Sequence, residues 1–122
     1  MQTIAIIGAG QLGSRHLQGL KRSAHNLDIW VADPSTNSLQ IAEERYNAIE
    51  NDIHKSVRFV TDIEILTTTI DIAIIASSSK PRLSICKALA SHAVVKYLIL
   101  EKFLFTSLHE YDEAATLLAQ YN

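Results

Sequence analysis

The sequence predicts an α/β fold, a doubly wound parallel sheet covered by helices on both faces. Short β-branched and aliphatic runs alternate along the whole chain with amphipathic patterns of helical length. Three of the four glycines lie within six positions of one another, directly after the first of these runs. Strands that alternate with helices form right-handed βαβ units, so the simplest packing has three layers (αβα) and the strand order 3-2-1-4-5.

The first half of the chain is expected to contain two strands and two helices. Residues 3–7 form a β-branched run that stops at Gly8, which is typical of a strand buried on both faces. Leucines then recur at spacings of one or two helical turns, with polar residues between them, and indicate a helix. Residues 27–32 are expected to form the second strand, and residues 35–46 the second helix.

The second half continues this alternation. Residues 70–76 are the most apolar run of the chain and are expected to form a central strand. Pro81 is acceptable in the first turn of the helix that follows. The remaining expected elements are a short strand at 57–60, a helical turn from Asp62 to Leu66, a helix at 81–92, a strand at 97–100 and a helix at 108–119.

Composition and charge indicate one globular domain, residues 1–122. Lys and Arg number 11 and Asp and Glu 13, so the formal charge of −2 gives no field that attracts polyanions, and nucleic acid is not expected as a partner. The apolar runs are far shorter than the ~20 residues that cross a bilayer, so no membrane association is expected. The single cysteine, Cys86, cannot form an internal disulfide, and we expect it to be a buried residue of a cytoplasmic protein.

The glycine cluster reads Gly8-Ala9-Gly10-Gln11-Leu12-Gly13 and matches the pattern G-x-G-x-x-G between a strand and a helix. In this setting Gly8 allows the tight turn, Gly10 leaves room for a pyrophosphate, and Gly13 lets the helix approach the first strand. The free N–H groups and the positive dipole end of the helix then bind the anion. The alternative is a glycine-rich turn without a ligand.

An acidic residue, Asp33, follows the second predicted strand, 20 positions after Gly13. Its carboxylate would accept hydrogen bonds from both hydroxyls of an adenosine ribose and would repel a phosphate on the 2′ position. No Arg or Lys lies between Asp33 and Arg45 to compensate such a phosphate, so NAD is expected in preference to NADP. The alternative for Asp33, which precedes Pro34, is a turn or helix-capping role.

Two more polar segments follow the fourth and fifth predicted strands, at the edge where ligands bind in open α/β sheets. Ser77 and Ser78 are nearest the end of the fourth strand and are candidates for the nicotinamide ribose pocket, with an ordinary helix-capping loop as the alternative. Glu101 and Lys102 directly follow the fifth strand. A lysine there could hydrogen-bond a substrate hydroxyl near the carbon that exchanges hydride, although the spacing alone favours a surface ion pair.

These segments together resemble the Gfo/Idh/MocA family, which includes glucose-fructose oxidoreductase and inositol dehydrogenase. The resemblance rests on the glycine turn with His16 after it, the acidic end of the second strand, the Thr61-Asp62 turn and the Glu101-Lys102 pair. It implies an N-terminal Rossmann domain, a larger substrate domain beyond it, and NAD(P)-dependent oxidation or reduction of a sugar or cyclitol hydroxyl.

The resemblance also implies roles for single residues. The residues that would hold the pyrophosphate are Gly8, Gly10, Gln11, Leu12 and Gly13. Asp33 would hold the adenosine ribose. Glu101 and Lys102 would correspond to the family's Glu-Lys-Pro motif, whose lysine contacts substrate and cofactor. Lys102 is therefore the candidate catalytic residue, and Glu101 joins the candidate cofactor-binding residues.

The chain departs from the family pattern at two places. Phe103 follows Lys102 where the family commonly has a proline, often in a cis bond, and a cis bond before a non-proline residue costs roughly 3 kcal/mol more. The loop after the fourth strand carries Ser77, Ser78 and Arg82 where the family usually has Thr-Pro and a later histidine. Both departures lie at the expected nicotinamide end of the site.

Two functions remain open from the sequence. The first is the cofactor-binding domain of an NAD-dependent oxidoreductase acting on an alcohol carbon of a small sugar-like molecule, inactive without the substrate domain that this chain lacks. The second is a stand-alone module that binds or senses the dinucleotide. The apolar edge strand at 97–100 is expected to lead to homo-oligomers. No two of the five histidines are four residues apart, so no metal site is expected, and His16 is expected to cap or pack the first helix.

Overall fold

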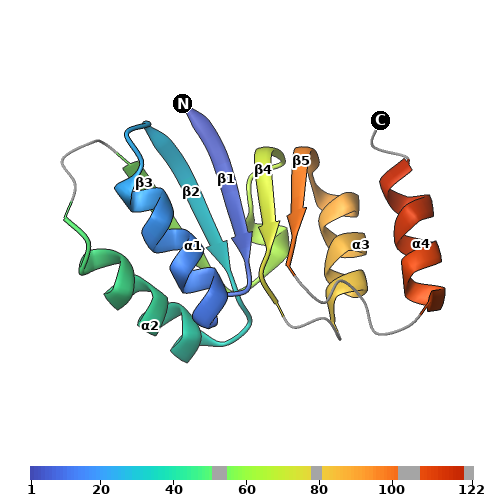
Figure 1. The fold of residues 1–122 in the computed structure, drawn as a ribbon, viewed down its shortest axis with the longest axis horizontal. Coiled ribbons are helices and arrows are strands. Elements are labelled where there is room, and N and C mark those ends of the chain that lie inside the picture. Colours follow the sequence, from blue (N-terminus) through green and yellow to red (C-terminus); the bar gives the residue numbers. More distant parts are fainter. Residues whose placement is uncertain (51–54, 78–80, 102–107, 120–122) are drawn as a thin grey trace.

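The computed structural model describes residues 1–50, 55–77, 81–101 and 108–119, together with the side chains of all of these except 108–111, 118 and 119. Five strands form one parallel sheet with the order β3-β2-β1-β4-β5, which confirms the predicted fold class and strand order (Figure 1). The strands are β1 (Gln2–Ile7), β2 (Leu27–Ala32), β3 (Lys55–Val60), β4 (Thr69–Ile75) and β5 (Val94–Leu100).

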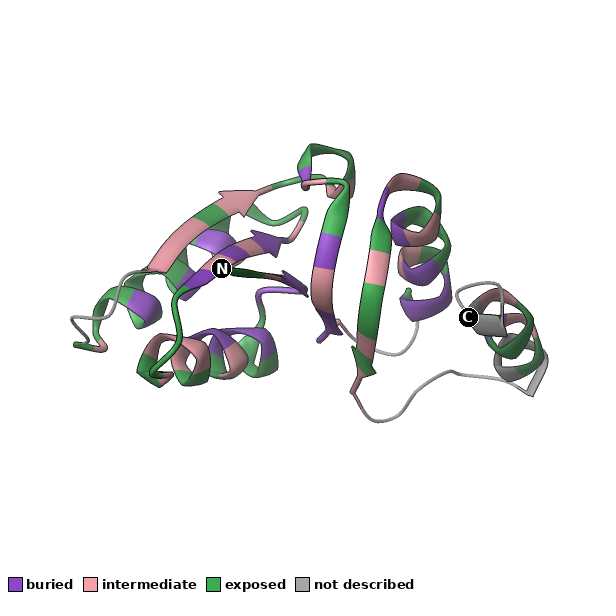
Figure 2. Ribbon diagram, turned by 90° about the horizontal axis from the view of Figure 1, so that it is seen from above, coloured by how far each residue is buried: buried purple, intermediate pink, exposed green. Residues whose placement is uncertain are grey.

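Helices lie on both faces of the sheet, as a doubly wound fold requires. The helical elements are α1 (Gln11–Arg22), α2 (Thr36–Asn47), the 3₁₀ turn η1 (Ile63–Ile65), α3 (Arg82–His92) and α4 (Leu108–Ala119). Seen from above, α1 and α2 lie on one side of the sheet and η1 and α3 on the other, while α4 lies beyond β5 (Figure 2). The direction of winding therefore changes between β1 and β4, and the carboxyl ends of these two strands form the switch point.

Every element expected from the sequence is present, and the largest differences concern where the third and fifth strands begin. The fifth strand starts at Val94, three residues before its predicted start at Tyr97, because Val94 already pairs with Thr69 of β4. Lys96 interrupts the apolar pattern of this segment, so hydrophobicity alone does not indicate that residues 94–96 belong to the strand. The third strand likewise begins at Lys55, two residues before its predicted start.

Side chains of β1 alternate between two hydrophobic cores, which is why this strand is apolar at nearly every position. Ile4 and Ile6 pack into the core beneath α1 and α2. Ala5 and Ile7 pack into the core beneath α3 and η1, which also contains Cys86 as expected. The strand is thereby fixed from both faces, and its carboxyl end is a rigid base for the turn that follows.

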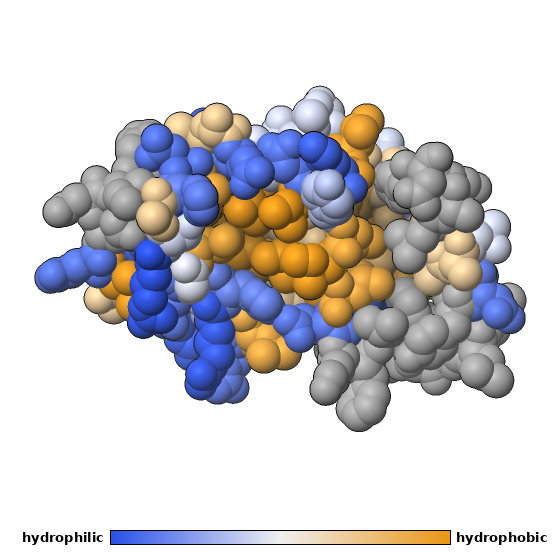
Figure 3. All heavy atoms as spheres, turned by 45° about the horizontal axis from the view of Figure 1, so that its top comes forward, coloured by the Kyte–Doolittle hydropathy of each residue, from blue (hydrophilic) through white to orange (hydrophobic). Residues whose placement is uncertain are grey.

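The α1 side of the sheet is covered unevenly. Beyond α1, no described helix covers β5 on this side, and Tyr97 and Ile99 are 61% and 47% exposed. Figure 3, which views the molecule from this side, shows apolar side chains gathered in the middle of the surface. Within the described part of the chain, no helix has the length and apolar character needed to span a membrane.

Candidate functional site

The turn after β1 depends on a glycine at its first position. Gly8 has φ +106°, a left-handed conformation that side chains rarely adopt. A Cβ at Gly8 would lie 2.7 Å from the backbone nitrogen of Ser77, so β4 also approaches too closely for any other residue. The Gly8 N–H donates to the carbonyl of Ala32 at 2.8 Å. The chain ends of β1, β2 and β4 therefore meet at this single residue.

Gly13 and Gly10, the other two glycines of the motif, have different roles at the N-terminus of α1. A Cβ at Gly13 would lie 1.8 Å from the carbonyl oxygen of Gly8, so only glycine lets α1 lie directly against the end of β1. Gly10 precedes the helix and has open space where its side chain would be. The predicted division of labour in the motif, close packing at Gly13 and free space at Gly10, agrees with this geometry.

The N-terminus of α1 has no capping side chain and no acidic residue that would offset its partial positive charge. Gly10 offers no capping group, and the first turn, Gln11, Leu12 and Gly13, contains no acidic residue. Helix N-termini carry unsatisfied N–H groups and a partial positive charge, so this end of α1 is suited to an anion such as a diphosphate. Gln11 and Leu12 are exposed beside it, and Gly13 is buried beneath it.

Asp33 ties the glycine turn to the segment after β2. One carboxylate oxygen accepts from the N–H of Ala9 at 2.7 Å, and the other accepts from the N–H of Ser35 at 2.8 Å. The turn role that the sequence left open for Asp33 is therefore present. Each carboxylate oxygen has a second lone pair, and Asp33 also lines the cavity described below, so both oxygens retain capacity for further donors.

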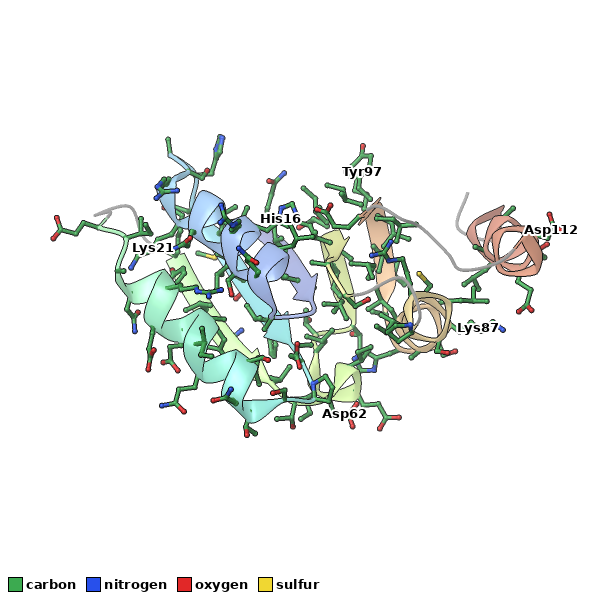
Figure 4. All side chains as sticks on the ribbon, turned by 60° about the horizontal axis from the view of Figure 1, so that its bottom comes forward. His16, Lys21, Asp62, Lys87, Tyr97 and Asp112 are labelled. Carbon is green, nitrogen blue, oxygen red and sulfur yellow. The ribbon has the colours of Figure 1, made fainter. Side chains whose placement is uncertain are left out.

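A cavity of about 1010 Å³ opens at the carboxyl edge of the sheet, on the η1 and α3 side of the switch point. Gly8, Gly10, Asp33 and Ser77 line it, so four of the predicted site residues surround one space. Asp62, labelled at this edge in Figure 4, contributes to the wall from the segment after β3. The volume is at the upper end of the range for ligand sites and is sufficient for a nucleotide.

The remaining predicted residues lie beside this cavity or outside the described part of the chain. Glu101 and the three residues of the first turn of α1 are not part of the cavity wall. Ser78 and Lys102 fall among the residues that the structure does not describe, so their expected roles stay predictions.

Arg82, at the start of α3, connects the ends of β4 and β5. Its side chain is fully buried. The guanidinium donates to the carbonyl of Ser77 at 2.5 Å and to the carbonyl of Glu101. The sequence marked Arg82 only as a departure from the family pattern, and the structure shows that this residue holds two of the strand ends that form the site.

Glu101 also forms a side-chain contact that the sequence did not indicate. Its carboxylate accepts a hydrogen bond from Nε2 of His16, which lies in α1, 85 positions earlier. His16 was expected to cap or pack α1, and it instead reaches across the switch point to the end of β5. Only the strand order together with the position of His16 in the second turn of the helix could have indicated this pair.

Two buried groups have shifted pKa values, and neither lies in the cavity wall. Burial raises the pKa of the Cys86 thiol, and the nearby Arg82 guanidinium partly opposes this effect. Burial also raises the pKa of the Tyr46 hydroxyl in α2. Among the described residues, no three His, Cys, Asp or Glu side chains come together as a metal site.

Comparison with known proteins identifies the family of the chain. Residues 2–122 match the model of the Gfo/Idh/MocA oxidoreductase family with an NAD-binding Rossmann fold. No curated protein matches the chain.

Solved structures with the same fold are distant in sequence. GenD2 from gentamicin A biosynthesis, in complex with NAD, has a TM-score of 0.74 at 18% identity, over 98% of this chain and 32% of its own. A putative myo-inositol dehydrogenase from Sinorhizobium meliloti 1021 has a TM-score of 0.72 at 17% identity, over 99% of this chain and 34% of its own.

An oxidoreductase from Agrobacterium radiobacter, in complex with NAD+, L-tartaric acid and magnesium, has a TM-score of 0.70 at 17% identity, over 98% of this chain and 33% of its own. The chain thus spans about a third of the length of these structures, which at such identities support the fold alone. The match to the family model covers nearly the whole sequence, and the chain belongs to the Gfo/Idh/MocA family of NAD-binding, Rossmann-fold oxidoreductases.

Proposed function

We propose that this chain is the cofactor-binding domain of an oxidoreductase that transfers hydride between NAD and an alcohol carbon of a sugar- or cyclitol-like small molecule. The observation that carries the proposal is the uncapped N-terminus of α1, which lies beside Asp33 at the edge of a nucleotide-sized cavity. Membership of an NAD-binding oxidoreductase family supports the reaction class. The substrate type rests on the family resemblance and on the likeness in fold to one distant protein, the putative myo-inositol dehydrogenase.

We propose that three groups of residues hold the diphosphate, the adenosine ribose and the nicotinamide ribose of the dinucleotide. The amides at the start of α1, with Gly8, Gly10, Gln11, Leu12 and Gly13, would bind the diphosphate. Asp33 would accept from the hydroxyls of the adenosine ribose. Ser77, Ser78 and Glu101, which follow β4 and β5, would contact the nicotinamide ribose. The dinucleotide supplies the hydride acceptor, and the protein supplies binding and orientation.

The charge of the cavity wall favours NAD over NADP. Asp33, Asp62 and Glu64 all line it, and a 2′-phosphate on the adenosine ribose would add negative charge next to these carboxylates. Since close like charges repel, the phosphate of NADP is expected to weaken binding.

The substrate side of the reaction rests on Lys102, which we propose as the catalytic residue. Its place directly after Glu101 puts it in the family's Glu-Lys-Pro position, with Phe103 instead of the proline. We also propose that the substrate pocket belongs to a second domain. The structures with the same fold are about three times as long as this chain, which supports that arrangement.

A second candidate, a stand-alone module that binds or senses the dinucleotide, shares every cofactor contact with the first. The cavity supports both equally, whereas the oxidoreductase family match favours the first. The two are distinguished by the reading frame after Asn122: a mixed α/β segment there supports the oxidoreductase, and a stop codon supports the module.

We further propose that the chain forms homo-oligomers through the exposed apolar residues of β5. Tyr97 and Ile99 leave an apolar surface that association would cover. Sedimentation velocity over a range of concentrations should show a species larger than a monomer, and a strictly monomeric species at the highest concentration contradicts this proposal.

The experiment that tests the cofactor proposal is calorimetric titration of the chain with NAD and with NADP. The wild-type chain should bind NAD more tightly. Asp33→Asn keeps an oxygen that can accept from Ala9 but loses the oxygen that accepts from Ser35 and removes the negative charge, so it should weaken NAD about tenfold and reduce the preference over NADP. Asp33→Ala should weaken both cofactors further, because the N–H of Ala9 in the glycine turn loses its acceptor.

The matched control is Glu43→Gln, which makes the same charge change on an exposed residue of α2. This variant should bind both cofactors like the wild type. Equal affinity of the wild type for NAD and NADP, or unchanged NAD binding by Asp33→Asn, contradicts the role of Asp33. Failure of the wild type to bind either dinucleotide contradicts the proposed function itself.

A further inference from the structure

Glu101 forms hydrogen bonds through its N–H, its carbonyl oxygen and one carboxylate oxygen, and each partner comes from a different element. Its N–H donates to the carbonyl of Ile75 in β4 at 3.3 Å. Its carbonyl oxygen accepts from Arg82 in α3. Its carboxylate accepts from His16 in α1, which Figure 4 labels on the side of the helix that faces β4 and β5. Three elements thereby fix one residue immediately after the edge strand β5.

The contact with His16 differs from the other two because it crosses between the two halves of the fold. Main-chain pairing with β4 and the bond from Arg82 both stay within the half formed by β4, β5 and α3. His16 belongs to α1, the helix whose N-terminus is the proposed diphosphate site. The hydrogen bond from His16 to Glu101 therefore connects the phosphate-binding helix directly to the end of β5.

The surroundings of this pair distinguish it from an ordinary surface ion pair. The side chains of His16 and Glu101 are 33% and 24% exposed, so both are largely shielded from solvent and salt. A carboxylate can only accept, so Nε2 of His16 is the donor. Because the His16 donor is held on a helix, it restricts the Glu101 carboxylate to a small set of orientations. The carboxylate of a mobile surface side chain would not be restricted in this way.

We propose that His16 is a positioning residue that holds the Glu101 carboxylate ready for the nicotinamide riboside half of the dinucleotide. This inference rests on the proposed function, in which the strand ends of β4 and β5 receive that half. The diphosphate and adenosine contacts, made by the glycine turn and Asp33, do not involve the pair. Loss of His16 should therefore weaken the contribution of the nicotinamide half and leave the adenosine half unchanged.

Titration calorimetry of the 122-residue chain with two ligands tests this separation. ADP contains the adenosine and diphosphate groups, and NAD adds the nicotinamide riboside. His16→Ala should bind ADP within about twofold of the wild type and bind NAD roughly three- to tenfold more weakly, as expected for one partly buried hydrogen bond to a charged group. His16→Gln, which keeps a donor at the end of the side chain, should recover part of the NAD affinity.

Two further variants show whether the effect passes through Glu101. Glu101→Ala, which removes the acceptor of His16, should also weaken NAD and spare ADP. The double variant of His16→Ala and Glu101→Ala should bind NAD no more weakly than Glu101→Ala alone, because His16 acts only through Glu101. His25→Ala is the matched control, since His25 is an exposed histidine outside α1, and it should leave both affinities unchanged. Thermal unfolding of each variant checks that the fold is retained.

The possible failures are distinguishable. A wild-type chain that binds neither ADP nor NAD overturns the proposed function and this inference with it. A wild-type chain that binds NAD, together with a His16→Ala variant that binds NAD normally, overturns the inference alone. Equal weakening of ADP and NAD by His16→Ala also overturns it, because that result assigns His16 a general structural role in α1. Additive effects in the double variant exclude a role through Glu101.

Discussion

The two halves of the sheet contribute different groups to the candidate site: one contributes mainly backbone, and in the other side chains hold the strand ends. In the half formed by β1, β2 and β3 with α1 and α2, the site consists mainly of backbone, because the glycines remove side chains and expose the amides of α1. In the half formed by β4 and β5 with α3, side chains hold the strand ends: Arg82 binds the carbonyls of Ser77 and Glu101.

This difference determines what a substitution can do in each half. A backbone site fails when an atom is added, since the space between α1 and β1 is already filled. A site held by side chains fails when a donor is removed, since the partly buried carbonyls then lose that hydrogen bond.

The largest effect is expected from adding one methyl group in the first half. Gly13→Ala would place Cβ 1.8 Å from the carbonyl oxygen of Gly8, and both groups belong to packed backbone that cannot move independently. The helix must shift away from β1, so we expect a loss of about 3 kcal/mol or more in the free energy of unfolding, measured by urea denaturation.

The control lies in the same helix. Gly19 has no atom within 4 Å of an added Cβ, so Gly19→Ala should be neutral or stabilise the chain by up to about 1 kcal/mol through helix propensity. If Gly13→Ala unfolds at the same urea concentration as Gly19→Ala, then α1 does not lie against β1 as described.

The second largest effect is expected from removing a donor in the other half. Arg82→Met keeps most of the buried volume but leaves the carbonyls of Ser77 and Glu101 without the guanidinium, which should cost about 2–4 kcal/mol in the free energy of unfolding. Lys87→Met is the control on the same helix, since Lys87 is exposed and forms a surface ion pair with Glu113 at 2.6 Å. That change should cost no more than about 1 kcal/mol. Equal losses for the two variants contradict the role of Arg82.

The same contrast explains how much of the site could be predicted from the sequence. The local geometry of the first half was largely predictable, because it depends on glycines at fixed spacing, and a glycine pattern is visible in a single sequence. Gly8, Gly13 and Asp33 have the local geometry that the motif requires. The strand order followed from the alternation of elements and the handedness of their connections.

The second half was predictable only as a location. Strand ends marked where Ser77 and Glu101 would lie, but His16 and Arg82 reach them through contacts that no spacing rule describes. The pair of His16 and Glu101 is separated by 85 positions, and it depends on the packing of α1 against the sheet. Contacts of this kind require the folded arrangement, so the sequence alone did not indicate that His16 and Arg82 contact the ends of these strands.

The smallest predicted effect concerns Cys86, which lies one helical turn after Arg82 in α3. Burial raises the pKa of its thiol in the folded chain above the ordinary value of 9.0, which the unfolded chain retains. As the pH rises through that value, the thiol of the unfolded state loses its proton first, so the free energy of unfolding should decrease with pH, by at most about 1.4 kcal/mol per pH unit for this group.

Urea denaturation at about pH 7.5 and about pH 9.5, on either side of the ordinary thiol pKa, should show this decrease in the wild type and a smaller one in Cys86→Ala. Because the Arg82 charge opposes the shift, Arg82→Met should steepen the dependence. An identical pH dependence in the wild type and Cys86→Ala would show that the thiol is not buried beside Arg82.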